Sequence, residues 1–479
     1  MAATVIDQFS KGQVIENNSV PTQEVILNNL VNEISLIDFN IELSLIGLNL
    51  AKEKAAQKHY RIVIIEKLIK YARDKEWNLA VQNDFTYVFN GAYWIPIGKD
   101  VFKKFLGNIA IKLGYRLADA KDYKFQDDLY KQFLSEGHFE KPEKKNDEVL
   151  INCLNGTLII NKDGYSLKSF ESNDFITYQL PFEYNENSRC KRFTQFLNEV
   201  LPDQGCQKVI QEYIGYVFIK ASILKLEKVL VLHGDGRNGK SVFFDIINAL
   251  LGEQNITNYS SAQLNEEHYR ALISNALLNY SSEFGGGMDS DTFKQLASGE
   301  PIGARLKYGN AFTMKDYARL AFNTNILPHN VEHNTAFFRR FLIVPFTQTI
   351  PDEKVDPELA KKIITNELAG IFNWVLEGLK RILENKKFTD SEIVSGVLKT
   401  YQQESDSVHL FVEERGYKSS TCNYEKLKIL YSDYKEFCLD DGLRALGKNN
   451  FGKRIESLGF QRGIEGANEK VVYLEKMFL

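Results

Sequence analysis

Apolar residues recur every three or four positions over much of this chain, and that spacing predicts helices that bury one face. Four stretches carry the pattern: residues 23–75, a second stretch that ends near 139, 192–220 and 351–383. In two other stretches, apolar and polar residues alternate instead. These stretches are residues 85–97, around Asn90-Gly91, and residues 157–170, around Asn161–Gly164. Each alternating stretch predicts a β-hairpin, because alternating faces and turn-forming residues occur together there.

Continuous apolar runs in the middle of the chain predict short buried strands. Three such runs are present: residues 228–232, 276–282 and 318–322. The first run leads into a glycine-rich segment and then into an apolar helix over residues 241–251, which Gly252 ends. The sequence therefore predicts a strand, a loop and a helix in direct succession.

The last block, residues 406–479, has a pattern of its own. One helix is predicted over residues 423–439 and a second over 448–458, and residues 460–478 predict a two-stranded wing. The charged run at residues 140–147 predicts an exposed loop or a boundary between domains.

Composition narrows the class of protein only moderately. A chain of 479 residues can form three or four domains, and 44% hydrophobic with 25% charged residues is ordinary for a globular protein. The net charge of -4 gives no global basic field for nucleic acid. The cysteines are scattered without a C-x-x-C pair, which favours a reducing compartment. Because no signal peptide or long apolar run is present, we expect a cytoplasmic protein that does not span a membrane.

The segment Gly234–Ser241 is the most specific motif of the chain. Its eight residues fit G-x-x-x-x-G-K-[ST], with the predicted strand before it and the predicted helix after it. Such glycines let backbone N–H groups turn toward phosphates, and the start of the helix adds partial positive charge. We expect Lys240 to reach the β- and γ-phosphates of ATP and the Ser241 hydroxyl to bind Mg2+. The predicted nucleotide-binding residues are Gly234, Asp235, Gly236, Arg237, Asn238, Gly239, Lys240, Ser241 and Val242.

A carboxylate and two amides follow the later strands. Phosphoryl transfer to water requires a carboxylate near Mg2+ and the attacking water, and Glu283 is the candidate for both tasks. Ser282 stands where many ATPases carry an aspartate, so a second carboxylate contact to the metal stays open. An amide at the next strand end can bond the γ-phosphate and the water, with Asn325 as first choice and Asn323 as the fallback.

Two adjacent arginines complete the predicted chemistry. An arginine that reaches from one subunit into the nucleotide of its neighbour stabilises the charge of the transition state. Arg340 is the first choice for this role and Arg339 the second, against the simpler interpretation of an ordinary surface pair.

A different motif, H-x-x-E-H at His329–His333, can mark a zinc protease. Zinc chemistry needs both histidines on one face of a helix and a third ligand downstream. This segment follows Pro328 directly, where a loop is expected, and no convincing downstream ligand follows. We therefore expect no metal site there.

The order of these motifs resembles that of the superfamily 3 helicases, most closely the phage, plasmid and poxvirus primase-helicase branch. The resemblance covers about residues 80–479 and is specific over about 206–346. It implies an AAA+ core that assembles as a ring, usually a hexamer, and moves on single-stranded DNA by hydrolysing ATP. It also implies a channel-lining hairpin before the Asn motif, and the basic residues of that segment are candidate DNA contacts: Lys294, Arg305 and Lys307.

The last block resembles the winged-helix domain that ends many of these proteins. Its second predicted helix could enter a DNA groove through Lys448, Lys453 and Arg454. The alternative, a small helical cap that packs on the ring, stays open. No primase signature is present, so a separate primase or replication protein is an expected partner.

The predicted fold is an α/β AAA+ P-loop core with a helical N-terminal region, a small α+β pre-helicase domain and a C-terminal winged helix. The predicted domains are the N-terminal region 1–145, a collar-like pre-helicase domain 146–205, the core 206–350, a helical extension 351–405 and the winged helix 406–479.

The expected function is that of a homo-hexameric, ATP- and Mg2+-dependent helicase on single-stranded and forked DNA. It would serve replication of a phage, plasmid or other mobile element in a bacterial host cell. Two alternatives stay open: an origin-binding initiator in which ATP controls assembly, and a DNA-stimulated ATPase that does not unwind.

Overall fold

The computed structural model describes residues 23–76, 78–82, 85–137, 148–161, 164–282, 284–285, 289–307, 309–328, 331, 333–466 and 468–476. The chain forms two compact units, one of residues 1–144 with 168–179 and one of residues 145–167 with 180–479. The five-part division expected from the sequence stays a prediction. Within the described residues, no helix is long and apolar enough to cross a membrane.

The first unit combines helices with a small antiparallel sheet. Its helices are α1 (Gln23–Glu33), α2 (Phe39–Leu45), α3 (Gln57–Asp74), α4 (Lys99–Lys112), α5 (Leu117–Ala120) and α6 (Tyr123–Glu136). Its strands are β1 (Leu79–Gln82), β2 (Phe85–Phe89) and β3 (Trp94–Ile97), in the order β1-β2-β3. The predicted hairpin is confirmed as β2 and β3, and the sequence missed β1. The Asn90 side chain closes the turn by accepting from the N–H groups of Ala92 and Tyr93.

A parallel five-stranded sheet is the centre of the second unit, so the coarse prediction of a mixed α/β fold is confirmed. Its strands are β7 (Val229–His233), β8 (Ile256–Thr257), β9 (Leu278–Ser281), β12 (Arg319–Thr324) and β13 (Phe341–Pro345), in the order β13-β7-β12-β9-β8. The three apolar runs in the sequence correspond to β7, β9 and β12.

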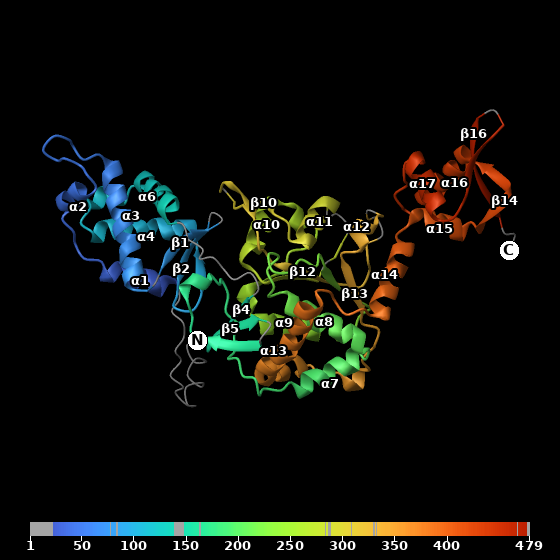
Figure 1. Cartoon of the computed structure of the whole chain (residues 1–479), viewed down its shortest axis with the longest axis horizontal. Helices are drawn as coiled ribbons and strands as arrows, with labels where there is room; N and C mark the ends of the chain where they lie inside the picture. The colour runs from blue at the N-terminus through green and yellow to red at the C-terminus, as the bar shows by residue number, and fades with distance from the viewer. Residues whose placement is uncertain are drawn as a thin grey trace, which may run out of the picture. The chain divides into compact units, whose positions relative to one another are not determined.

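Helices cover both faces of this sheet (Figure 1). One face carries α8 (Gln204–Tyr216), α9 (Lys240–Leu251) and α13 (Leu359–Asn385), and the other carries α10 (Glu267–Leu272) and α11 (Ser290–Ser298). Alternate strand residues such as Val231 and Phe322 pack with Phe293 on the second face. The remaining helices of the core are α7 (Lys191–Val200), α12 (Thr335–Phe338) and α14 (Glu392–Glu404).

Smaller elements surround the core. A second sheet has the order β4-β5-β6, so the predicted hairpin at residues 157–170 gains a third strand. An antiparallel hairpin, β10 with β11, lies between β9 and β12 in the chain. These strands are β4 (Val149–Cys153), β5 (Gly156–Asn161), β6 (Gly164–Lys168), β10 (Ile302–Arg305) and β11 (Ala311–Met314). Single 3-10 turns occur at Ser172–Asp174, Glu253–Asn255, Gln263–Asn265, Ile273–Asn275 and Asp352–Lys354.

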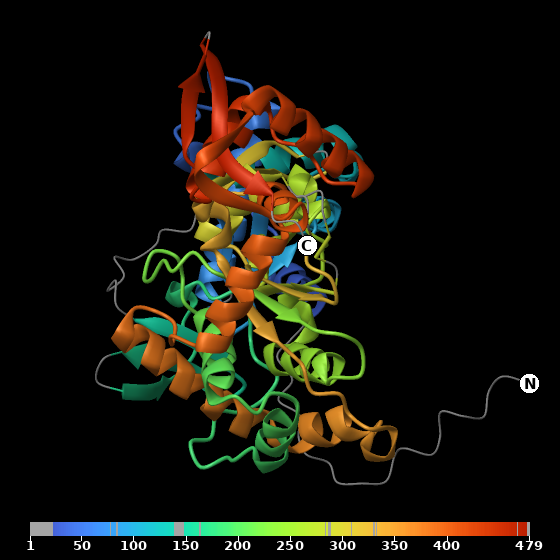
Figure 2. The same ribbon diagram turned by 90° about the vertical axis from the view of Figure 1, so that its right-hand side faces the viewer.

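The end of the chain has its own apolar core of three helices and a sheet. These elements are α15 (Ser407–Glu414), α16 (Leu427–Asp440), α17 (Lys448–Ser457), β14 (Tyr417–Lys426), β15 (Arg462–Glu465) and β16 (Glu469–Lys476). The two strands predicted over residues 460–478 are present as the antiparallel pair β15 and β16, and the winged-helix fold stays a prediction. The helix predicted from residue 423 is wrong at its start, because Tyr424–Lys426 pair with β16 and the helix begins at Leu427. Figure 2 shows β14 beside β16 in red.

Close backbone packing joins α8 to α13 through glycines. A Cβ on Gly378 would lie 2.5 Å from the carbonyl carbon and oxygen of Gln211, and one on Gly215 would lie 2.7 Å from the Leu379 nitrogen. Backbone atoms cannot yield as a flexible side chain can, so these two positions require glycine.

We expect Gly378→Ala to lower the free energy of unfolding by about 1–3 kcal/mol through overpacking. Gly396→Ala is the matched control, because it lies in helix α14 with open space around its Cβ position. Alanine favours a helix over glycine, so this control should leave stability equal or slightly raised. Urea unfolding followed by circular dichroism separates the two, and equal stabilities would contradict the packing argument.

Asp406 anchors the C-terminal block. Its side chain is 2% exposed and accepts from both the Nε and an Nη of Arg454, each at 2.6 Å. It also caps α15 by accepting from the N–H of Val408. Arg454 therefore has a structural partner inside the block.

Arg454→Ala should destabilise this block by about 1–3 kcal/mol, because it leaves the buried Oδ2 of Asp406 without its guanidinium donors. Its neighbour Lys453 is exposed, and Lys453→Ala should change stability by less than about 0.5 kcal/mol. Differential hydrogen exchange over residues 406–476 reports the loss locally, and unchanged protection in Arg454→Ala would disprove the anchoring role.

Candidate functional site

The carboxyl edge of the central sheet collects most of the predicted nucleotide-site residues. β7, β12 and β13 are parallel, so their carboxyl ends lie along one edge, where open α/β sheets bind ligands. The Gly234–Ser241 segment begins directly after β7 and runs into the first turn of α9. Thr324 of β12 is in register with His233 of β7, which places Asn323 and Asn325 at the same edge.

Two glycines of the loop have no room for a side chain. Gly234 has φ +151°, and a Cβ there would lie 2.3 Å from the Phe346 carbonyl oxygen. Gly239 has φ +84°, and its Cβ would lie 2.6 Å from Cγ1 of Val200. Gly236, in contrast, has nothing within 4 Å of its Cβ position. The loop backbone thus lies close to the end of β13 and to α7, which only glycine permits at these two positions.

Lys240 is buried within its own loop. Its Nζ donates to the carbonyl oxygens of Asp235 at 3.1 Å and of Gly234, and to Oδ1 of Asn238 at 3.2 Å. Burial lowers its pKa from the ordinary lysine value. Asn238 in turn donates from Nδ2 to the Phe346 carbonyl oxygen at 2.9 Å. These neutral acceptors hold the Lys240 ammonium group inside the glycine-rich loop.

The remaining loop residues are less enclosed. Asp235, Arg237 and Ser241 are exposed, and Arg237 forms an ion pair with Asp352 at 2.8 Å. Ser241 is the loop residue that could offer a hydroxyl oxygen to a magnesium ion, and Val242 is half-buried. Glu283, the predicted metal and water residue, lies outside the described residues. Within those residues, no group of three or more His, Cys, Asp or Glu side chains could hold a metal ion.

The two candidate amides differ in their surroundings. Asn323 is half-buried, and its Oδ1 accepts from the Tyr280 hydroxyl at 3.0 Å. Asn325, the first choice from the sequence, is exposed and is therefore the more accessible of the two amides. Tyr280 was missed by sequence reasoning, since nothing in an apolar strand run distinguishes a tyrosine that bonds across to another strand. Burial raises its pKa.

The two candidate arginines lie at the opposite, amino edge of the sheet. Both precede β13, whose first residue, Phe341, is in register with Val229 at the start of β7. The Arg340 side chain is 8% exposed and donates to Ser298 Oγ at 2.9 Å and to the Ala336 carbonyl. The Arg339 side chain is 58% exposed. Arg339 is therefore the more accessible of the two arginines, and which of them acts on a nucleotide stays a prediction.

The basic segment before β12 forms the β10–β11 hairpin. Arg305 ends β10 and lies 3.6 Å from Glu267, and Lys307 lies exposed in the turn. Lys294 lies on α11 and pairs with Asp291 at 3.0 Å, away from the hairpin in sequence. Arg270 of α10 fixes the hairpin by donating from Nε to the Gly303 carbonyl oxygen at 2.9 Å.

The remaining candidate residues belong to other segments of the chain. Lys448 and Lys453 are exposed on α17, whereas Arg454 is bound to Asp406. His329 and Glu332 of the H-x-x-E-H motif lie outside the described residues. Nε2 of His333 lies 2.7 Å from the Gln402 carbonyl oxygen, which gives this histidine a partner in the protein.

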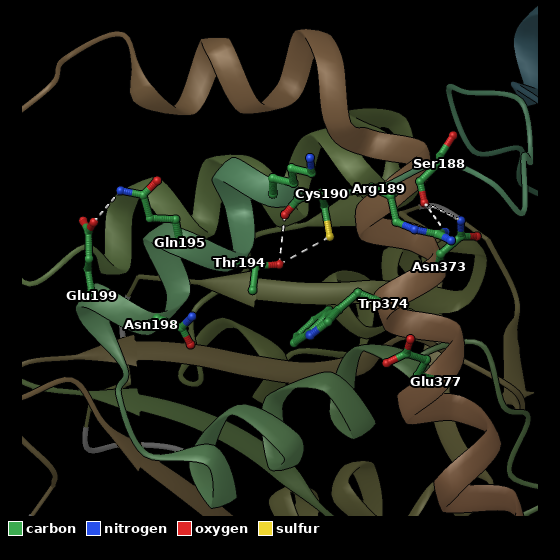
Figure 3. Close-up of a pocket in the computed structure, with 12 residues that line it drawn as sticks. Ser188, Arg189, Cys190, Thr194, Gln195, Asn198, Glu199, Asn373, Trp374 and Glu377 are labelled. Carbon is green, nitrogen blue, oxygen red and sulfur yellow. Dashed lines mark hydrogen bonds between the residues drawn. The ribbon is translucent and has the colours of Figure 1, made fainter.

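A separate pocket of about 1000 Å3 lies between α7 and α13 (Figure 3). Arg189, Cys190, Thr194, Trp374 and Glu377 are among its lining residues. Thr194 donates to the Cys190 carbonyl, as the dashed line shows. None of the lining residues is one of the predicted site residues.

Comparisons with known proteins add two family matches. Residues 65–202 match the model "D5 N terminal like", which supports a relationship with the D5 family. Residues 232–340 match "Family of unknown function (DUF5906)". The second match extends from the end of β7 to Arg340 and so includes the phosphate-loop motif, both amides and both arginines.

The chain is also similar to solved structures. One is "The A form apo structure of NrS-1 C terminal region-CTR", at 11% sequence identity and a TM-score of 0.46, covering 85% of this chain and 98% of that one. Another is "The apo structure of NrS-1 C terminal region (305-718)", at 12% identity and a TM-score of 0.44, covering 85% and 97%. Neither likeness carries information about activity.

Proposed function

We propose that this chain is an ATP-dependent DNA helicase, a ring-forming AAA+ motor of the superfamily 3 type. It would serve replication of a phage, plasmid or other mobile element in a bacterial host cell. The D5-like match at residues 65–202 supports a place in a primase-helicase family. The motif order around residues 234–340 supports the motor activity.

One geometric observation carries the proposal: the phosphate loop and the arginines lie at opposite edges of one parallel sheet. β7 and β13 pair over five residues each, from Val229–Phe341 to His233–Pro345. At 3.3 Å per residue, this separates the two edges by roughly 15 Å. Arg339 therefore cannot complete the nucleotide site of its own subunit through the sheet, and a neighbouring copy in a ring can supply it.

Each residue has a distinct task in the proposed hydrolysis. Lys240 and the loop N–H groups bind the β- and γ-phosphates, and Asn325 orients the γ-phosphate and the water. A bound Mg2+, held by Ser241, would neutralise phosphate charge, and Glu283 stays the proposed residue for the attacking water. The exposed Arg339, rather than the buried Arg340, would stabilise the transition state in the neighbouring subunit.

Movement on DNA requires contacts that track a phosphate backbone. The β10–β11 hairpin exposes Arg305 and Lys307, and Ile302 and Ala304 bury its other face. We propose that these two cations contact single-stranded DNA in the ring and that a separate primase or replication protein acts with the helicase. Lys294, Lys448 and Lys453 stay secondary candidates for DNA contact.

Lys240→Ala should lower ATP turnover by about 100-fold or more, because it removes the charge opposite the transferring phosphate. Gly239→Ala should weaken nucleotide binding by about tenfold or more, since the left-handed conformation disfavours a Cβ by about 1–2 kcal/mol. Gly396→Ala is the control and should bind as the wild type does, because its Cβ position is open and it lies on α14, outside the loop. Normal turnover in Lys240→Ala would refute the ATPase.

Arg339→Ala should abolish hydrolysis but be rescued in mixed rings. An equal mixture with Lys240→Ala places an intact loop beside an intact arginine at about a quarter of the interfaces by random assembly. Turnover of the mixture should therefore recover to about that fraction of the wild-type value. The control is Arg340→Ala, whose buried side chain supports its own subunit and should not be rescued. If the mixture with Arg339→Ala recovers no more turnover than the mixture with Arg340→Ala, Arg339 does not act in trans.

A further inference from the structure

Glu227 has an unusual backbone. It lies two residues before the first residue of β7. Its φ of +57° falls in the left-handed conformation that favours glycine. A residue with a Cβ loses about 1–2 kcal/mol in this conformation. Such local strain concentrates at functional positions, where the side chain is needed in one place. The conformation therefore directs attention to what the Glu227 carboxylate contacts.

The carboxylate lies among three cations. Its oxygens are 2.7 Å from an Nη of Arg339, 3.6 Å from an Nη of Arg340 and 3.5 Å from Nζ of Lys225. Two of these cations have further acceptors, since Arg340 donates to Ser298 Oγ and Lys225 pairs with Glu300 at 3.1 Å. Glu227 is the acceptor that the described structure gives to the Arg339 guanidinium.

The backbone of Arg339 is fixed separately from its side chain. Nζ of Lys228 donates to the Arg339 carbonyl oxygen at 2.5 Å, and Phe337 and Phe338 anchor the preceding turn in the apolar core. The guanidinium can thus change partner without movement of β13. An exposed ion pair such as Arg339–Glu227 contributes only about 0.2–1 kcal/mol to stability. Phosphate oxygens are stronger acceptors, so they can displace the Glu227 carboxylate from the guanidinium.

We propose that Glu227 is a positioning residue that holds Arg339 in its own subunit and releases it to the phosphates of a neighbouring nucleotide. This inference rests on the proposed function. Glu227 and the phosphate compete for one guanidinium, so Glu227 opposes formation of the active interface until nucleotide is bound. It also screens three adjacent positive charges from one another in the free subunit.

The test measures ATP turnover against protein concentration for Glu227→Gln, which removes the charge and keeps the shape. Because the Arg339 guanidinium is then no longer held by Glu227, the interface should form more easily. The protein concentration at half-maximal turnover should therefore fall about two- to fivefold. Glu227→Gly serves as a second variant, because glycine adopts φ +57° without strain, and it should show the same fall. In an Arg339→Ala background, neither change should shift the assembly concentration measured by light scattering.

Glu300→Gln is the matched control. It removes an acid from the same cluster and touches Lys225 but not Arg339, so its half-maximal concentration should equal that of the wild type. An unchanged or higher value in both folded Glu227 variants, or the same fall in Glu300→Gln, would overturn the inference. Wild-type turnover that does not depend on protein concentration would refute the ring-forming ATPase, and this inference with it.

Discussion

The parallel pairing of β13 with β7 and of β7 with β12 is the constraint on which the rest of the candidate site depends. Parallel strands place all carboxyl ends on one edge, so the loop after β7 and the two amides at the end of β12 both lie there. The same pairing places the residues before β13 on the opposite edge. This pairing thus places Lys240 and Asn325 at one edge of the sheet and Arg339 at the other.

Close backbone packing fixes the position of the glycine-rich loop. The contact of Gly234 with the Phe346 carbonyl, and of Gly239 with Val200, fixes the loop between β13 and α7. In this enclosed setting the Lys240 ammonium satisfies its donors with loop oxygens. In the proposed nucleotide complex, phosphate oxygens would offer the same donors charged acceptors in place of the loop oxygens.

Buried acids hold together segments that are remote in the sequence. Glu212 of α8 is fully buried and accepts from Arg381 at 2.5 Å and from the N–H of Thr389 at 2.7 Å, which joins α8 to the end of α13 and the segment after it. Asp406 does the same for α15 and α17. Both carboxylates are buried, and a buried charge is costly unless cations and N–H groups pair with it.

The sequence by itself determined the local elements of the site. The strand, glycine-rich loop and helix around Lys240, and the hairpins at 85–97 and 157–170, follow from short-range patterns that neighbouring residues set. The sequence also placed the basic residues Arg305 and Lys307 on the segment that forms the β10–β11 hairpin. Tertiary structure decided what depends on remote partners. Arg339 and Glu227 meet across 112 positions, and Arg454 and Asp406 across 48. Which arginine is exposed, and which cation is already paired, follows from packing between distant segments, and no local pattern records that.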